Sequence, residues 1–286
     1  MGYDVSYHPI SEDEIHEWYF DRLADIKTGN SETAVALAQR HGIKELYIGK
    51  YLNVLQSAAE FETNVSFETS HGFYLAVVQG FFRKYFYIRG GAFTFLVRAD
   101  ESFWRYTMPW QEILRLSIAN PINNMIMENW NSGVYLPYDG LCRLLDDYAN
   151  MPEIRGKLDE LFSDKRIDVF LKAVRFAVEH KLGILEATEV IQPQPFNLNE
   201  TPCLSNLFNC DTDGPLLFRE AALEQVAHLN DKPAPVKKGG FFSRLFGKTK
   251  NSLIDILHRY KASPLSVTNA TLLTFRGNTG PLLFIL

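Results

Sequence analysis

The chain has 286 residues, of which 46% are hydrophobic and 22% are charged, and this composition excludes a wholly disordered protein. The formal net charge is −5, from 29 basic and 34 acidic residues, which argues against broad nucleic-acid binding because phosphate contacts need clustered Lys and Arg. The aromatic share of 13% predicts a well-filled core and one aromatic patch on the surface.

The cysteines predict a reducing compartment, and the hydropathy pattern predicts neither a signal peptide nor a membrane span. Cys142, Cys203 and Cys210 are an odd, sparse set without a CxxC motif, so a disulfide scaffold is not expected. The first 20 residues lack a basic stretch followed by an apolar one, and no apolar run reaches the length of about 18 residues that a membrane span requires. We therefore expect a cytoplasmic protein.

The first elements follow from local signals. Residues Tyr3–Ile10 alternate and are rich in β-forming residues, which predicts a strand, and Ser11 with Glu14 forms a capping box that begins a helix. Helical spacing continues through Ile26 and then predicts helices over Glu32–Arg40 and Lys44–Phe61.

The most apolar stretch of the sequence is Ser70–Arg98. It predicts a buried helix over His71–Arg83, followed by a β-hairpin with strands Tyr85–Arg89 and Ala92–Arg98. Gly90 and Gly91 form the expected turn, since a primed turn needs positive φ at both central positions.

Helical spacing dominates the middle of the chain. Helices are expected after Pro109, around 141–148, after Pro152 and over 167–178, with Gly183 as the C-cap of the last one. Extended segments are expected at Gly133–Leu136 and Ala187–Ile191. An irregular connection over Gln192–Asp213 and a helix over Pro215–His228 follow.

Composition divides the chain into three parts. Residues 1–228 predict the main globular domain, 229–250 a basic linker containing Pro and Gly, and 251–286 a helix over 253–260 with a terminal hairpin of strands 271–275 and 281–286. The last 36 residues are too few to bury a core alone, so we expect them to dock on the main domain or on a second subunit. The fold class predicted for the chain is α+β, predominantly helical, with short antiparallel strands.

No motif for a catalytic triad, a phosphate-binding loop or a metal site occurs in the sequence, so no metal or cofactor is expected. If the protein is an enzyme, its site must be assembled from distant residues. The candidates are His71, Arg89, Asp211 and Asp213, which lie beside apolar segments or in the irregular connection. A structural role is favoured over a reactive one for Cys203 and Cys210.

Residues 237–250 read KKGGFFSRLFGKTK and carry five positive charges without an acid, which leaves the rest of the chain at −10. The candidate binding residues are Lys237, Lys238, Phe241, Phe242, Arg244 and Lys248. The favoured interpretation is a tether whose aromatic side chains pack into a groove of the main domain. Contact with an anionic membrane, and contact with a protein or nucleic acid, are the alternatives.

The opening sequence Met1–Ile10, MGYDVSYHPI, resembles the openings of uncharacterised bacterial proteins, some of which are toxin-neutralising immunity proteins. The resemblance implies a protein that blocks a toxin's active site or surface, and it carries no functional residues over. Together with the acidic balance, it favours a non-enzymatic protein that binds another protein. An enzyme of unknown substrate and a peripheral membrane protein remain the alternatives.

Overall fold

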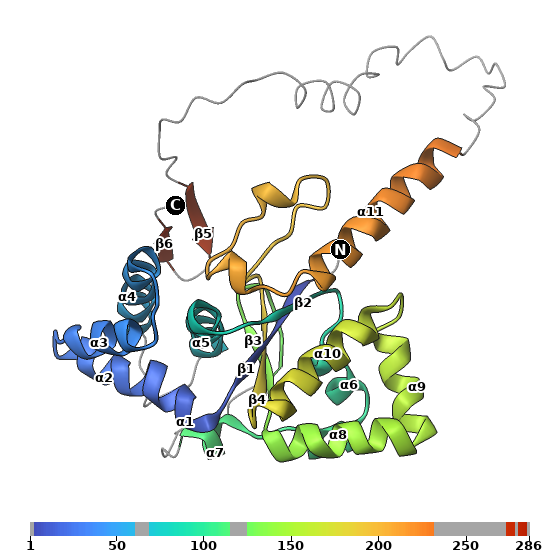
Figure 1. The fold of residues 1–286 in the computed structure, drawn as a ribbon, viewed down its shortest axis with the longest axis horizontal. Coiled ribbons are helices and arrows are strands. Elements are labelled where there is room, and N and C mark those ends of the chain that lie inside the picture. The colour runs from blue at the N-terminus through green and yellow to red at the C-terminus, as the bar shows by residue number, and fades with distance from the viewer. Residues whose placement is uncertain (1–2, 61–68, 115–124, 232–272, 278–279, 285–286) are drawn as a thin grey trace, which may run out of the picture. The chain divides into compact units, whose positions relative to one another are not determined.

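The computed structural model describes residues 3–60, 69–114, 125–231, 273–277 and 280–284. The chain divides into two compact units, Met1–Lys232 and Pro233–Leu286 (Figure 1).

The centre of the first unit is a four-stranded antiparallel sheet of order β2-β1-β4-β3. Its strands are β1 (Asp4–Ile10), β2 (Phe86–Arg89), β3 (Ser132–Leu136) and β4 (Gly183–Thr188). Tyr7 lies opposite Phe86 on one neighbour and opposite Glu186 on the other. Nearly every strand residue is buried, which means that both faces of the sheet are covered.

Helices and short helical turns make up most of the remainder. Before β2 these are α1 (Glu12–Ile15), the π-helical η1 (His16–Phe20), α2 (Asp21–Lys27), α3 (Glu32–Arg40), α4 (Glu45–Ala59) and α5 (Thr69–Phe82). Between β2 and β4 lie α6 (Phe93–Ala99), the 3-10 helix η2 (Glu101–Tyr106), α7 (Trp110–Leu114), α8 (Tyr138–Asn150), α9 (Pro152–Leu161) and α10 (Arg166–Glu179). After β4 come the 3-10 turns η3 (Leu198–Glu200) and η4 (Leu207–Asn209), and then α11 (Asp213–Asp231).

Two apolar clusters sandwich the sheet. On one face, α5 packs on β1, β3 and β4 and carries α2, α3 and α4 outside it; on the other, α10 packs on β1, β2 and β4 beside α6, α8 and α9 (Figure 1). Because side chains alternate along a strand, β1 sends Val5 and Tyr7 to the α10 side and Ser6 and His8 to the α5 side. The prediction of a predominantly helical α+β fold is confirmed.

The outer edge of β2 is covered by the segment that leads into α11. The Tyr85 amide donates to the Asn209 carbonyl at 3.0 Å, and the Asp211 amide donates to the Tyr85 carbonyl at 2.8 Å. One turn later the helix itself reaches the strand, and a Cβ built on Gly214 would lie 1.8 Å from the Tyr87 carbonyl oxygen. Glycine therefore permits α11 to begin directly against the backbone of β2.

Local signals identified the elements well. The Ser11 hydroxyl accepts from the Glu14 amide at 3.2 Å and the Glu14 carboxylate accepts from the Ser11 amide at 3.1 Å, as a capping box requires. The expected helix over Glu32–Arg40 has those bounds, and the irregular connection before Asp213 contains only 3-10 turns and isolated bridges.

The predicted hairpin around Gly90 and Gly91 is wrong. Gly90 does turn the chain with φ +73, but β2 pairs with β1, and the segment after it is the helix α6. Phe93, Leu96 and Val97 have the spacing of one helical face and are all buried, so tertiary packing overrides the β-propensity of this segment.

The prediction that Gly183 caps a helix is also wrong. Helix α10 ends at Glu179, and Lys181 takes the left-handed conformation with φ +56. Gly183 begins β4, where a Cβ would lie 2.2 Å from the Tyr135 hydroxyl of the neighbouring strand. Cross-strand packing, and not helix termination, requires glycine at this position.

In the second unit, β5 (Leu273–Gly277) pairs antiparallel with β6 (Gly280–Phe284), so the predicted terminal hairpin is present. The predicted linker and the helix over 253–260 lie outside the described residues. Over the described parts of the chain, none of the helices combines the length and the apolar character needed to cross a membrane.

Candidate functional site

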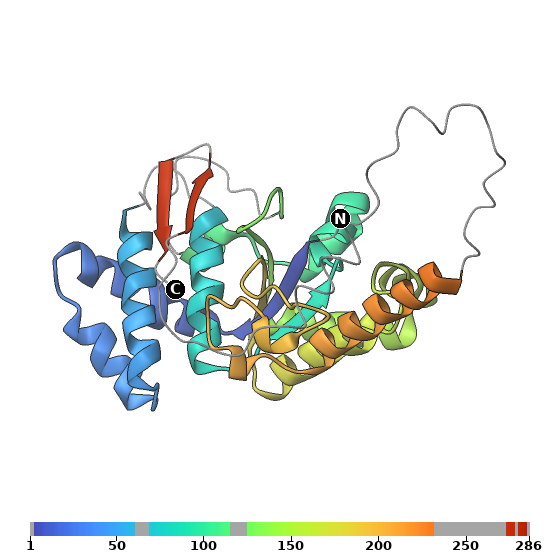
Figure 2. The ribbon, with the colours of Figure 1, turned by 90° about the horizontal axis from the view of Figure 1, so that it is seen from above.

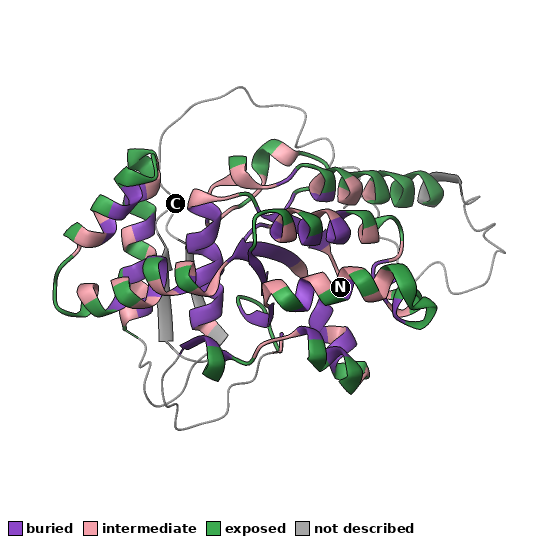
Figure 3. Ribbon diagram, turned by 60° about the horizontal axis from the view of Figure 1, so that its bottom comes forward, coloured by how far each residue is buried: buried purple, intermediate pink, exposed green. Residues whose placement is uncertain are grey.

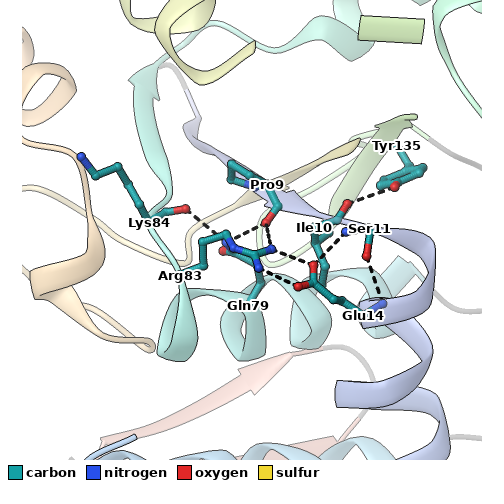
Figure 4. A network of polar contacts seen from close by, with 8 residues as sticks. All are labelled: Pro9, Ile10, Ser11, Glu14, Gln79, Arg83, Lys84 and Tyr135. Carbon is teal, nitrogen blue, oxygen red and sulfur yellow. Dashed lines mark hydrogen bonds and ion pairs between the residues drawn. The ribbon is translucent and has the colours of Figure 1, made fainter. Parts of the chain in front are cut away.

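A buried hydrogen-bond chain runs across β1 on its α5 side. His8 Nδ1 lies 2.7 Å from Gln79 Oε1, and His8 Nε2 lies 2.8 Å from Ser6 Oγ. The Gln79 amide nitrogen donates to the carbonyls of Pro9 and Lys84 (Figure 4). These bonds fix the amide so that its oxygen faces His8. Nδ1 must therefore carry the proton, and the Ser6 hydroxyl donates to Nε2.

This order of groups is that of a nucleophile, a base and a group that orients the base. Ser6, His8 and Gln79 are nevertheless fully buried, and none of them lines the two clefts described below. Burial lowers the pKa of His8 to about 4, against a smaller opposing effect of the Gln79 hydrogen bond, so the ring stays neutral. These hydrogen bonds satisfy polar groups inside the fold. The His8 ring also stacks on the Tyr85 ring, with 5.0 Å between the ring centroids, and this contact fixes its orientation.

A second buried polar cluster lies on the opposite face of the sheet. Glu186 Oε2 accepts from the Thr94 hydroxyl at 2.5 Å and from the Thr94 amide at 3.2 Å, while Oε1 lies 3.2 Å from the Tyr7 hydroxyl. The carboxylate thereby binds the first turn of α6. A Cβ on Gly133 would lie 2.1 Å from Glu186 Oε2, so glycine is required where the carboxylate packs against β3. Burial raises the pKa of Glu186 to about 6, and the hydrogen bonds from Thr94 limit the rise.

The sequence candidates Asp211 and Asp213 lie together at the start of α11. Lys172 of α10 pairs with Asp211 at 2.8 Å and with Asp213 at 2.6 Å, and Lys84 approaches Asp211 at 3.5 Å. Burial is the largest effect on Asp211 and disfavours its charged form, but the hydrogen bonds from Lys172 and the Asp213 amide, together with the charges of Lys172 and Lys84, outweigh it, so the pKa of Asp211 lies below its ordinary value. The Asp211 carboxylate also accepts from the Asp213 amide at 3.2 Å, which is an Asx turn directly before the helix.

The other two candidates lie in separate environments. Arg89 pairs with Asp4 at 2.6 Å, and its guanidinium carbon lies 5.2 Å from the centre of the Phe218 ring. His71 is buried on α5, where its Nδ1 lies 2.9 Å from the Tyr19 hydroxyl. Burial lowers the pKa of His71 to about 4, with a smaller contribution from Lys27. The structure therefore brings Asp211 and Asp213 together, and it places Arg89 and His71 with other partners.

The cysteines of the irregular connection are half-buried beside Tyr85, whose hydroxyl lies 3.3 Å from Cys203 Sγ. Burial raises the pKa of both Cys203 and Cys210, which keeps the thiols protonated. Among the described residues, no group of three or more His, Cys, Asp or Glu side chains could hold a metal ion. The candidate binding residues Lys237, Lys238, Phe241, Phe242, Arg244 and Lys248 lie outside the described residues.

Two clefts open beside α11. The smaller, of about 180 Å³, lies between β2 and the inner face of the helix, and Arg89, Arg166 and Phe218 are among its lining residues. The larger, of about 290 Å³, lies between α10 and the other side of α11, where Val169 and Leu216 line it.

The second half of α11 extends beyond the sheet, and residues 223–228 of it are exposed (Figures 2 and 3). It nevertheless carries large apolar side chains: Leu216, Leu223 and Val226 are 43%, 47% and 41% exposed. The helix thus has apolar residues on two sides. Only the side that carries Gly214 and Phe218 packs on the fold. We call residues 213, 216, 219, 220, 223, 224, 226 and 227 the outward face of α11.

The sequence-based search missed this surface. It correctly predicted a helix over Pro215–His228, and the spacing of Leu216, Leu223 and Val226 was readable in that segment. The signal was that apolar residues occur on opposite sides of one helix, whereas an ordinary surface helix has a single apolar stripe. Comparisons of the chain with protein-family models, with curated protein sequences and with solved structures found no match.

Proposed function

We propose that this protein is a non-enzymatic binding protein that recognises another protein through the outward face of α11. The observation that carries the proposal is the exposure of Leu216, Leu223 and Val226 on a helix whose first turns already pack on the fold through Gly214 and Phe218. Contiguous exposed apolar side chains cost free energy in water, and in monomeric proteins they mark interaction surfaces. A toxin is the class of partner that the opening-sequence resemblance implies.

The buried polar clusters support the same conclusion. The hydrogen-bonded side chains of Ser6, His8 and Gln79, and the cluster around Glu186, have the residue types of catalytic sites. Both groups are nevertheless enclosed in the fold. Asp211 and Asp213 pair with Lys172, and Asp211 accepts from the first amide of α11, so their contacts stabilise the start of the helix that carries the exposed surface.

Affinity capture of the tagged protein from its native host, followed by mass spectrometry, tests the proposal. We expect one stoichiometric partner with the wild-type chain and its loss from a Leu223→Asp, Val226→Asp variant. Leu46→Asp is the matched control, because Leu46 is 69% exposed on α4, and it should retain the partner. Absence of any stoichiometric partner would refute binding, and retention by the double variant would refute this surface.

A second candidate function is attachment to an anionic membrane through residues 237–250. It is favoured by the separation of charge along the chain: residues 1–232 contain 21 basic and 33 acidic residues, whereas 233–286 contain 8 basic and 1 acidic residue. The two units thus carry net charges of −12 and +7. Clustered basic residues with interspersed aromatic ones suit the surface of an anionic bilayer.

A further inference from the structure

We infer that the larger cleft and the outward face of α11 bind a basic amphipathic peptide segment of the partner protein. The inference rests on the proposed function and adds the chemistry of what is bound. The occupant would carry apolar anchors on one side and Lys or Arg beside them, in the manner of a helix laid into a groove.

We call the apolar residues that line the cleft its floor and the charged ones its rim. Val169 of α10 and Leu216 and Leu217 of α11 form the floor, and Leu223 continues the apolar surface two turns along the helix. An apolar cavity of about 150 Å³ is large enough for benzene, so about 290 Å³ admits one large anchor side chain. Leu216 and Leu223 lie about 10 Å apart along the axis, which suits anchors seven residues apart on a bound helix.

The rim of the cleft is acidic. Asp168 and Glu220 line it, and Glu224 follows Glu220 by one turn on the same side of α11. Within the part of the chain that the structure describes, none of these three carboxylates forms an ion pair. Asp213 also lines the cleft, but its charge is already neutralised by Lys172 at 2.6 Å.

The balance of charge at the cleft selects a cationic ligand. Lys165 is the one cation among the lining residues of the larger cleft, and Arg219 is an exposed cation on the outward face. The side chains of Lys165, Asp168, Arg219, Glu220 and Glu224 together carry a net charge of −1. The whole unit from Met1 to Lys232 adds a long-range field of the same sign, with a net charge of −12. A basic segment is therefore attracted at a distance and paired on contact, while an acidic one is repelled.

Binding of a synthetic 18-residue Lys/Leu amphipathic peptide to the full chain, followed by fluorescence anisotropy, tests the inference. Reversing two rim charges, with Glu220→Lys and Glu224→Lys, turns two attractions into repulsions and should weaken binding about tenfold. The matched control reverses two exposed acids elsewhere, with Glu179→Lys and Glu200→Lys, and should change affinity less than about twofold because net charge alone is altered. Circular dichroism should show unchanged folding in both variants.

Three results would overturn the inference. The first is equal weakening by the two pairs of substitutions, which indicates attraction to net charge alone. The second is equal affinity for a Lys/Ser peptide of the same charge, which indicates that the apolar floor is not used. The third is peptide binding that tightens more when Lys237, Lys238, Arg244 and Lys248 are changed to Glu than when Arg40, Lys44, Lys50 and Arg175 are, since the chain's own basic segment would then be the occupant.

The partner-capture experiment tests the proposed function separately from the peptide-binding experiment. If the captured partner depends on Leu223 and Val226 while the Lys/Leu peptide fails these tests, the outward face still binds a protein and only the basic chemistry of the ligand is refuted. If the captured partner is independent of both residues, the proposed function itself fails at this surface.

Discussion

Glu186 shows how a single buried acid couples stability to pH. Its carboxyl is enclosed between Thr94, Tyr7 and Gly133, and burial raises its pKa to about 6. The Tyr7 hydroxyl has two acceptors for its one proton, the Gly91 carbonyl at 3.0 Å and Glu186 Oε1 at 3.2 Å. Protonated Glu186 can donate to Tyr7, which then donates to Gly91, so the neutral carboxyl is fully satisfied.

We expect Glu186→Gln to remove one component of the pH dependence of stability. Because the folded-state pKa exceeds the ordinary value of 4.5, the folded state binds more protons, and wild-type stability falls as pH rises from 4.5 through 6. The loss is on the order of 2 kcal/mol for a shift of this size. Urea denaturation at pH 4.5 and 7 should show a smaller decrease in the variant.

Glu179→Gln is the matched control for this measurement. Glu179 is exposed at the end of α10, so its substitution should leave the pH dependence as it is in the wild type. An identical decrease in Glu186→Gln and wild type would contradict the assignment.

His8 affects the pH dependence of stability in the direction opposite to Glu186. Its folded-state pKa of about 4 lies below the ordinary value of 6.5, so its contribution to stability is present above pH 6.5 and is lost as pH falls toward 4. We expect nitrogen NMR of the His8 ring at pH 7 to show a neutral imidazole with the proton on Nδ1, and titration to give a midpoint near 4. A proton on Nε2, or a titration midpoint near 6.5, would refute the hydrogen-bond order assigned to Ser6, His8 and Gln79.

At the scale of elements, the contact between α11 and β2 depends on Gly214. Replacing it with Ala would place a methyl group 1.8 Å from the Tyr87 carbonyl oxygen, and backbone on both sides leaves no flexible side chain to yield. We expect Gly214→Ala to destabilise the protein by about 1–3 kcal/mol, measured by urea denaturation. Binding through the outward face should weaken as well, because the helix would be displaced.

Gly156→Ala provides the comparison. Gly156 lies within α9, and a Cβ there would meet no atom within 4 Å. Ala has the higher helix propensity, so this variant should gain up to about 1 kcal/mol. Destabilisation by both substitutions to the same extent would show that the close approach to Tyr87 is not the cause.

At the scale of the whole molecule, the charges of the two units have opposite signs, −12 and +7. If residues 237–250 contact an anionic membrane, the wild-type chain should sediment with phosphatidylserine vesicles and not with neutral ones. Changing Lys237, Lys238, Arg244 and Lys248 to Glu should reduce binding by more than about tenfold, since each basic residue near such a surface contributes about 1 kcal/mol.

The control for the vesicle experiment reverses four exposed basic residues of the first unit: Arg40, Lys44, Lys50 and Arg175. Both variants change net charge equally, so only a local role of residues 237–250 predicts a difference between them. Equal losses of vesicle binding, or no binding by the wild-type chain, would refute the membrane candidate.

Sequence alone determined the features that depend on neighbouring residues. The strand of β1, the capping box at Ser11 and the helix over Glu32–Arg40 were predictable because hydrophobic period and capping chemistry act within one or two turns. The predominantly helical α+β class followed from the same signals.

Tertiary structure decided the features that depend on distant partners. Phe93–Ala99 became a helix because the core and the carboxylate of Glu186, far along the chain, bind its first turn. The buried pairing of His8 with Gln79 and the exposure of Leu223 were likewise not readable locally, since burial depends on which elements pack together. The candidate binding surface therefore emerged only when one side of α11 was seen to be packed and the other exposed.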